Sequence, residues 1–287
     1  MLNRMPFGPA VALKEPRVPI LDAAAGAELI DGLTAVALSA AQAIRYVGQR
    51  AVHLKADGSP VTAADEAADA TIREGLTRLA PDLPIVSEEQ AEHDRPRDES
   101  ESYFLVDPLD GTREFIAGSD EYAINIALMS HGAPILGVIV APALGLLWRG
   151  VIGRGAERAE PGAGIKDLRR SPIRTRPRSH GELVVLVSRS HLEARTRAYI
   201  ERLPQPRMLP CGSALKFCRI AEGSADLYPR LAPTHDWDVA AGHALIMAAG
   251  GTMTAPDGGS LIYGTPERRI PAFIASGDPA GAPTLEP

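Results

Sequence analysis

Two carboxylates lie three residues apart in the segment Val106-Asp107-Pro108-Leu109-Asp110-Gly111-Thr112, directly after an apolar run. Pro108 fixes its backbone φ and Gly111 readily adopts turn conformations, so Asp107 and Asp110 are expected to lie close together in a fixed turn. Neighbouring carboxylates repel each other unless a cation lies between them, and oxygen ligands of this kind suit Mg²⁺. The segment therefore predicts a metal site. An ordinary acidic turn is the alternative, because Asp, Pro and Gly all favour turns.

Three further acidic residues stand next to predicted elements. Glu88 follows a short buried strand, and the alternative is that it merely opens a solvated acidic loop. Asp238 precedes an apolar helix, where an acid could simply complement the helix N-terminus. Asp65 stands in Thr62-Ala63-Ala64-Asp65, which has the spacing of a capping box, so its carboxylate could serve the helix alone.

Composition excludes several classes of protein. The chain has 287 residues, 45% of them hydrophobic, which is enough for two folded domains. Its net charge of -6 has the wrong sign for binding a nucleic acid polymer, whereas a small phosphorylated substrate remains compatible because metal ions can supply positive charge locally. Cys211 and Cys218 cannot form a disulfide framework, which favours a reducing compartment. No run of 18 apolar residues occurs, so we predict no integral membrane segment.

Hydrophobic periodicity predicts helices and an antiparallel sheet in the first half, and alternating strands and helices in the second. The first half should contain helices at 23–47 and from Pro60 to before Pro81, and strands at 85–87, 103–106, 122–129, 135–140 and 146–152. The acidic segment 88–101 is predicted to be a mobile loop, and the Arg-, Gly- and Pro-rich segment 154–180 to be a linker or a long surface loop. The second half should contain strands at 183–188, 207–209 and 225–228, and helices at 192–202, 213–222 and 237–249.

The chain therefore divides into four predicted parts. We expect a flexible N-terminal extension (1–21), an α+β metal-binding domain (22–155), an α/β substrate-binding domain (156–276) and a flexible tail (277–287). The overall fold class is α/β.

Four motifs resemble the inositol monophosphatase superfamily of lithium-sensitive, magnesium-dependent phosphatases. They fall in that family's order and spacing over about residues 22–276, and they are Lys55–Asp65, Ser87-Glu88-Glu89, Asp107–Ile116 and Trp237-Asp238. The segments 186–191, 212–218 and 228–230 resemble the branch of 3'(2'),5'-bisphosphate nucleotidases. The resemblance implies a layered αβαβα sandwich with the active site between the halves. One departure is Thr234-His235-Asp236, where the branch more often has an uncharged Asn and a β-branched residue.

The resemblance also implies roles for individual residues. Two or three Mg²⁺ ions would be held by Glu88, Asp107, the backbone carbonyl of Leu109, Asp110 and Asp238. Asp65, Thr112 and Glu88 would be the catalytic residues, and Asp65 and Thr112 would position the attacking water. The amides of Gly111 and Thr112 would hold phosphate oxygens. The substrate would also contact His191, Ser213, Lys216, Arg230 and Asp238. A solvated helix face is the alternative for Lys216, and a helix cap is the alternative for His191.

The activity implied by the resemblance is Mg²⁺-dependent removal of the 3'-phosphate of adenosine 3',5'-bisphosphate, and of its sulfated precursor, in sulfur assimilation. Hydrolysis of inositol or sugar phosphates is the nearest alternative, since a metal motif does not distinguish leaving groups. A non-catalytic phosphate-binding protein is a third, although every acid expected for catalysis is present. Relatives imply a cytoplasmic location, or a peripheral one at the inner membrane, and a homodimer.

Overall fold

The computed structural model describes residues 23–47, 52–54, 58, 60–90, 102–160, 167–177, 181–189, 192–280 and 282. The predicted extension 1–21, most of the predicted tail beyond 280, and residues 91–101 of the predicted mobile loop lie outside the described residues. So do Lys55–Asp57 and the candidate substrate contact His191.

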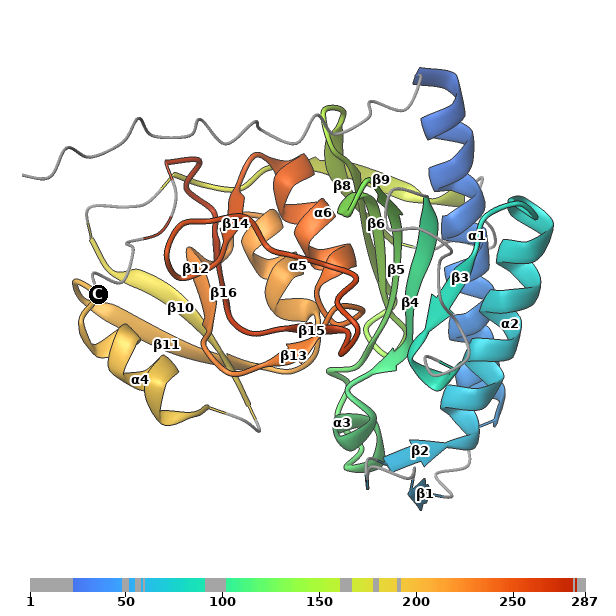
Figure 1. The fold of residues 1–287 in the computed structure, drawn as a ribbon, viewed down its shortest axis with the longest axis horizontal. Helices are drawn as coiled ribbons and strands as arrows, with labels where there is room; N and C mark the ends of the chain where they lie inside the picture. The colour runs from blue at the N-terminus through green and yellow to red at the C-terminus, as the bar shows by residue number, and fades with distance from the viewer. Residues whose placement is uncertain are drawn as a thin grey trace, which may run out of the picture.

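A seven-stranded sheet forms the centre of the first half (Figure 1). Its order is β3 (Ile85–Ser87), β4 (Tyr103–Asp110), β5 (Ala123–Ser130), β6 (Ala133–Ala141), β7 (Leu146–Val151), β8 (Gly155–Glu160) and β9 (Arg169–Ile173). Only the β3–β4 pair of this sheet is parallel. The β5–β6 and β6–β7 pairs are antiparallel as predicted, and the β4–β5, β7–β8 and β8–β9 pairs are antiparallel too. Both faces are covered, which explains why β4, β5 and β6 read as almost continuous apolar runs rather than as alternating ones.

Two long helices cover one face of this sheet, α1 (Ala23–Val47) and α2 (Ala63–Leu79). Their apolar stripes, including Leu33 and Ile72, pack with the sheet residues that point toward them, such as Phe104. By length and apolar composition, Gly26–Val47 is the one helix among the described residues that could cross a membrane. Its buried side packs into this core, as expected of a core helix in a folded domain.

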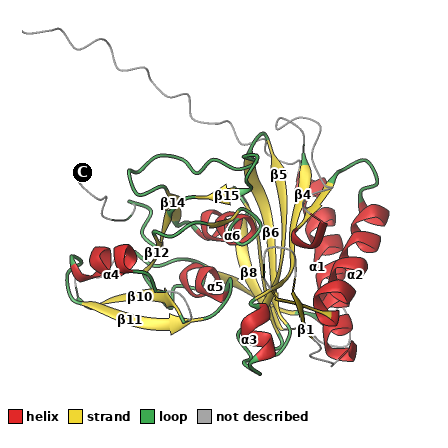
Figure 2. Ribbon diagram, turned by 60° about the horizontal axis from the view of Figure 1, so that its bottom comes forward, coloured by secondary structure: helices red, strands yellow, loops and turns green. Residues whose placement is uncertain are grey.

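The opposite face of the sheet packs against α5 (Leu215–Ala221) and α6 (Ala240–Ala249) (Figure 2). The approach of α6 is so close that a Cβ at Gly137 of β6 would lie 2.3 Å from the carbonyl oxygen of Ala241, so only glycine fits there. The close contact between β6 and α6 therefore fixes their relative position within the largest core cluster of the described residues.

A second sheet lies beyond α5 and α6, and α4 (Ala194–Glu201) packs on its outer face. Its order is β11 (Pro206–Cys211), β10 (Leu183–Ser188), β12 (Leu227–Arg230), β16 (Phe273–Ser276) and β14 (Thr252–Thr254). Two small pairs complete the fold, β1 (Val52–Leu54) with β2 (Pro60–Thr62) and β13 (Thr234–His235) with β15 (Arg269–Ile270). The layers follow the order helix, sheet, helix, sheet, helix, so the predicted αβαβα sandwich is confirmed.

The prediction of an irregular segment over 154–180 is wrong for residues 155–160 and 169–173, which form strands, whereas residues 174–177 have no regular secondary structure. Strands β8 and β9 continue the first sheet to Ile173. They escape detection because charged residues line them: Arg169 pairs with Glu160 at 2.6 Å, and Arg149 on the neighbouring strand is buried against Glu157 at 2.6 Å. Ion pairs replace the apolar alternation that would have revealed these strands. The division of the chain at residue 155 stays a prediction.

A buried histidine should make stability depend on pH. Burial lowers the pKa of His243, on α6, to about 4, and its Nδ1 lies 2.9 Å from the hydroxyl of Tyr263. The unfolded chain binds this proton near pH 6.5, so stability is present above that pH and is lost as the pH falls toward 4. We expect urea unfolding to show a loss of up to about 2 kcal/mol between pH 7 and pH 5 that His243→Gln lacks. Equal pH slopes in both proteins would contradict this.

Candidate active site

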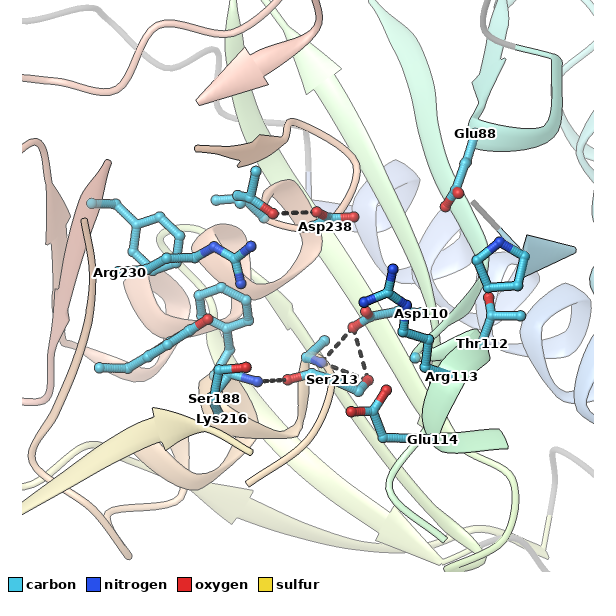
Figure 3. A pocket seen from close by; sticks show the side chains of 18 residues that line it. Glu88, Asp110, Thr112, Arg113, Glu114, Ser188, Ser213, Lys216, Arg230 and Asp238 are labelled. Atoms are coloured by element: carbon cyan, nitrogen blue, oxygen red, sulfur yellow. Dashed lines mark hydrogen bonds between the residues drawn. The ribbon is translucent and has the colours of Figure 1, made fainter. Parts of the chain in front are cut away.

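A cavity of about 240 Å³ opens between the two halves (Figure 3). From the first half it is lined by residues of η1 (Glu88–Gln90), the end of β4 and the short helix α3 (Thr112–Ile116). From the second half it is lined by residues that include Ser188, Ser213, Lys216, Arg230 and Asp238. Most of the candidate site residues thus come together around one cavity, although they span 150 positions from Glu88 to Asp238.

The parallel pairing of β3 with β4 brings Glu88 and Asp107 together. Ser87 is paired with Val106, so the next residue of each strand, a carboxylate in both cases, emerges at the same edge of the sheet. Asp238 approaches from the second half, just before α6. Oxygen atoms of these three carboxylates all lie within 4.8 Å of one another.

This cluster is electrostatically unfavourable on its own. Burial raises the pKa of Asp107 well above its usual value, and the charges of Glu88, Asp110, Asp238 and Asp65 raise it further, in that order. Asp107 is 1% exposed, so water cannot screen the repulsion. A cation between the carboxylates removes the conflict, and an all-oxygen donor set is the one that Mg²⁺ prefers. The residues present therefore fit a magnesium site.

Asp65 serves both the helix and the site. Its Oδ2 accepts hydrogen bonds from the backbone N–H of Thr62 at 2.8 Å and from that residue's hydroxyl at 2.6 Å, which closes the capping box of α2. Its Oδ1 accepts a bond from the Thr112 hydroxyl at 3.0 Å. The two interpretations of the sequence are thus compatible, because each uses a different oxygen of one carboxylate.

The turn after β4 arranges the backbone around Thr112. The chain bulges between Asp107 and Asp110, and Gly111 adopts a φ of 92°, a left-handed conformation that favours glycine. The backbone carbonyl of Leu109, a predicted metal ligand, lies 3.2 Å from the Thr112 hydroxyl. The Thr112 hydroxyl therefore lies between the carboxylate of Asp65 and the backbone carbonyl of Leu109.

Asp110 connects the metal site to the second half of the chain. Its Oδ2 accepts hydrogen bonds from the Ser213 hydroxyl at 2.8 Å and from the backbone N–H of Ala214 at 2.5 Å. Burial and the charge of Asp238 raise the pKa of Asp110, whereas the charge of Lys216 and these hydrogen bonds oppose the rise. Asp110 lies outside the group of three mutually close carboxylates, so its role as a metal ligand stays a prediction.

Two cations of the second half face the cavity. Lys216 is 4% exposed, and its Nζ donates to the backbone carbonyls of Ser213 at 2.6 Å and Cys211 at 3.2 Å, so the solvated-face alternative is wrong. Arg230 has a buried Nε with no acceptor among the described residues. Burial opposes its charge, but interactions with Tyr228, Asp238 and Asp110 hold the pKa of Arg230 above its usual value. An anionic group of a substrate bound in this cavity would therefore interact with both Lys216 and Arg230.

Asp238 is held by the segment that departs from the branch pattern. Its Oδ2 accepts hydrogen bonds from the Thr234 hydroxyl and from the backbone N–H of His235 at 3.1 Å. Asp236 instead turns away toward Arg268, whose Nη1 is 3.8 Å from its carboxylate. The unusual acid is therefore used in a buried ion pair, while Asp238 alone joins the carboxylate cluster.

Sequence reasoning missed Asp69, which is buried on α2 and bonded to the segment that carries Glu88. It accepts hydrogen bonds from the Ser87 hydroxyl at 2.5 Å, from Arg73 at 3.0 Å and from the Gln90 side chain at 3.2 Å. It thus fixes the residues on both sides of Glu88. Its spacing of four residues from Asp65 places both acids on one face of the helix, and this signal could have revealed it.

Replacing Asp69 by Asn should weaken metal binding, because Asp69 holds the segment that carries the candidate ligand Glu88. Residues that orient a metal ligand typically contribute about 10–100-fold to metal affinity. We expect the Mg²⁺ concentration for half-maximal activity to rise about tenfold, and the Mg²⁺-induced rise in melting temperature to shrink. The matched control is Glu74→Gln, which breaks an exposed ion pair of 2.7 Å with Arg78 on the same helix. Unchanged Mg²⁺ dependence in Asp69→Asn would show that this cluster only stabilises the helix.

The chain belongs to the inositol monophosphatase family, whose model matches residues 25–280. It is 41% identical to the 3'(2'),5'-bisphosphate nucleotidase CysQ of Shigella flexneri over 254 residues, which are 86% of this chain and 99% of that relative. The same enzyme of Escherichia coli K12 is 42% identical over 254 residues, with the same coverage of 86% and 99%. The crystal structure of CysQ from Bacteroides thetaiotaomicron superposes with a TM-score of 0.68 at 31% identity, covering 85% of this chain and 95% of that one.

Proposed function

We propose that this chain is a Mg²⁺-dependent phosphatase that removes the 3'-phosphate of adenosine 3',5'-bisphosphate. The observation that carries the proposal is one cavity with a carboxylate cluster on one side and two cations on the other. The CysQ relatives, named as bisphosphate nucleotidases, support the choice of substrate. The sulfated precursor carries the same 3'-phosphate and is included in the proposal.

Glu88, Asp107 and Asp238 would hold Mg²⁺, with Asp110 and the carbonyl of Leu109 as further candidate ligands. When bound, two or three such ions neutralise the phosphate and lower the pKa of a coordinated water. No side-chain nucleophile is then needed.

The chain's own residues guide the attacking water. Because the Thr112 hydroxyl donates to Asp65, its lone pairs are free to accept a hydrogen bond from a water, which orients that water for attack. The backbone amides of Gly111 and Thr112 are candidates to hold the oxygens of the phosphate being cleaved. Ser213, Lys216 and Arg230 would hold the other end of the substrate.

The test is a comparison of kcat/KM for adenosine 3',5'-bisphosphate and inositol 1-phosphate with Mg²⁺ present. We expect the nucleotide to be favoured by at least about tenfold, the effect of one charge-assisted contact to its second phosphate. A higher value for inositol 1-phosphate would reject the nucleotide assignment. No phosphate release above background with any substrate would support a non-catalytic role. The homodimer, the cytoplasmic location and lithium sensitivity stay predictions.

A further inference from the structure

An ion pair joins the two halves beside the cavity but outside the proposed catalytic set. Arg189, directly after β10, donates from Nε to Oε2 of Glu121 at 2.9 Å and from Nη2 to Oε1 at 2.8 Å. Glu121 lies in the first half, just before β5. Bidentate pairs of this kind fix the orientation of both planar groups.

The same carboxylate also holds the backbone of the second half. Oε2 of Glu121 accepts a hydrogen bond from the backbone N–H of Gly212 at 2.8 Å. A Cβ at Gly212 would lie 2.9 Å from both the Cβ and the carbonyl oxygen of Glu121, so the two backbones approach closely. Position 212 can therefore keep this contact only as glycine.

The backbone that Glu121 holds is central to the cavity. Ser213 and Ala214 donate to Asp110, and the carbonyl of Ser213 accepts from Lys216. Ser213 has a φ of 51°, a sparsely populated conformation that must be maintained by its surroundings. A shift of this segment would thus move Lys216 and the contacts to Asp110 together.

Opposite charges on Glu121 and Arg189 favour a stable ion pair. Burial opposes ionisation of Glu121, but hydrogen bonds from Arg189 and from the Gly212 backbone keep the pKa of Glu121 below its usual value. The Arg189 guanidinium is directed to Glu121 and, from Nη2, to the backbone carbonyl of Pro210 at 3.3 Å, and neither Arg189 nor Glu121 lines the cavity. These contacts point to a role of Arg189 through Glu121.

We propose that Glu121 and Arg189 are positioning residues that hold the Gly212–Ala214 backbone where it meets the remote end of the substrate. The inference rests on the proposed function for the identity of that substrate. Under this proposal, loss of the Glu121–Arg189 pair weakens substrate binding more than it slows the chemical step, although neither residue contacts the substrate or the metal.

The experiment is a double-mutant cycle in the full chain with Glu121→Gln, Arg189→Met and the double variant. Steady-state constants are measured with saturating Mg²⁺ on whichever of adenosine 3',5'-bisphosphate and inositol 1-phosphate the wild type turns over better. The choice made by the wild type tests the proposed function, and the variants separately test the positioning role. Melting temperatures report whether each variant is folded.

Glu121→Gln should raise KM about five- to tenfold while kcat stays within about threefold, since a binding contact is weakened and the reacting groups remain. Arg189→Met should raise KM less. The double variant should resemble Glu121→Gln alone, because Arg189 acts through that carboxylate.

The matched control is Glu182→Gln with Arg207→Met, which removes an exposed ion pair of 2.5 Å between the start of β10 and β11. It should leave KM unchanged. Additive losses in the cycle would mean that Arg189 contacts the substrate directly, and would overturn the proposal. So would a KM within twofold of wild type in folded Glu121→Gln, or, if that variant does not fold, in Arg189→Met.

Discussion

Asp107→Asn is expected to reduce turnover to below about 1% of wild type at saturating Mg²⁺. The side chain is one of the three mutually close carboxylates, and the substitution removes a charge from the group expected to bind the cation. A hundredfold loss corresponds to about 2.7 kcal/mol of transition-state stabilisation. Asn has nearly the same volume as Asp, so the cavity should keep its shape. A folded variant that retains a tenth of wild-type turnover would show that Asp107 is not a central ligand.

The same substitution should stabilise the metal-free protein. Because the pKa of Asp107 is raised in the folded state, its stability contribution is greatest at low pH and is lost as the pH rises through that pKa. Metal-free Asp107→Asn should therefore melt about 2 °C or more above wild type at pH 8, with the difference shrinking at pH 5. Added Mg²⁺ should reverse the order. Scanning calorimetry with and without a chelator measures both effects, and a variant less stable than wild type without metal would contradict the repulsion.

Replacing Arg230 by Ala should raise KM for the bisphosphate nucleotide about ten- to a hundredfold, since a charge-assisted hydrogen bond contributes roughly 1.5–3 kcal/mol. A substrate with one phosphate lacks the group that this guanidinium would bind, so its hydrolysis should change much less. Lys216→Ala should follow the same pattern. It should also lower the melting temperature, because two backbone carbonyls lose their donor.

Thr112→Ala provides the contrast for these two variants. Its hydroxyl donates to Asp65 and is proposed to orient the attacking water, so its loss should lower kcat equally on both substrates. The ratio of kcat/KM between bisphosphate and monophosphate is the informative measurement. Equal losses on both substrates for Arg230→Ala and Lys216→Ala would show that neither residue recognises the second phosphate.

Much of the candidate metal site could be predicted because its residues lie in short local motifs. The turn of Asp107–Thr112 and the strand that ends before Glu88 are each formed by consecutive residues. The structure places the carboxylates of Asp107 and Glu88 close together. Long-range partners could not be predicted in this way. The donors to Asp110 lie 103 and 104 residues further along the chain, and no local pattern links them.

Two of the misses have a common physical cause, whereas the short apolar strand β16 was missed although it is buried. Hydrophobic periodicity detects elements that bury apolar faces, and it found α1, α2 and the central strands. It missed β8 and β9, whose pairing is accompanied by ion pairs across the strands, and Asp69, whose role lies in hydrogen bonds rather than in packing. Polar interactions specify geometry in this protein without leaving a periodic signature.

The bonds from Asp110 to the other half of the molecule limit how the enzyme can be recombined. A chimaera that joins residues 1–177 of this chain to the second half of a relative must reproduce the spacing between that carboxylate and the donors at 213 and 214, which here is 2.8 and 2.5 Å. Exchanging whole halves would therefore transfer a substrate preference only between relatives in which these bonds between the halves have matching geometry. Point substitutions of second-half residues that line the cavity but do not bond to Asp110 offer the more direct route to a new specificity, because they leave the bonds between the halves intact.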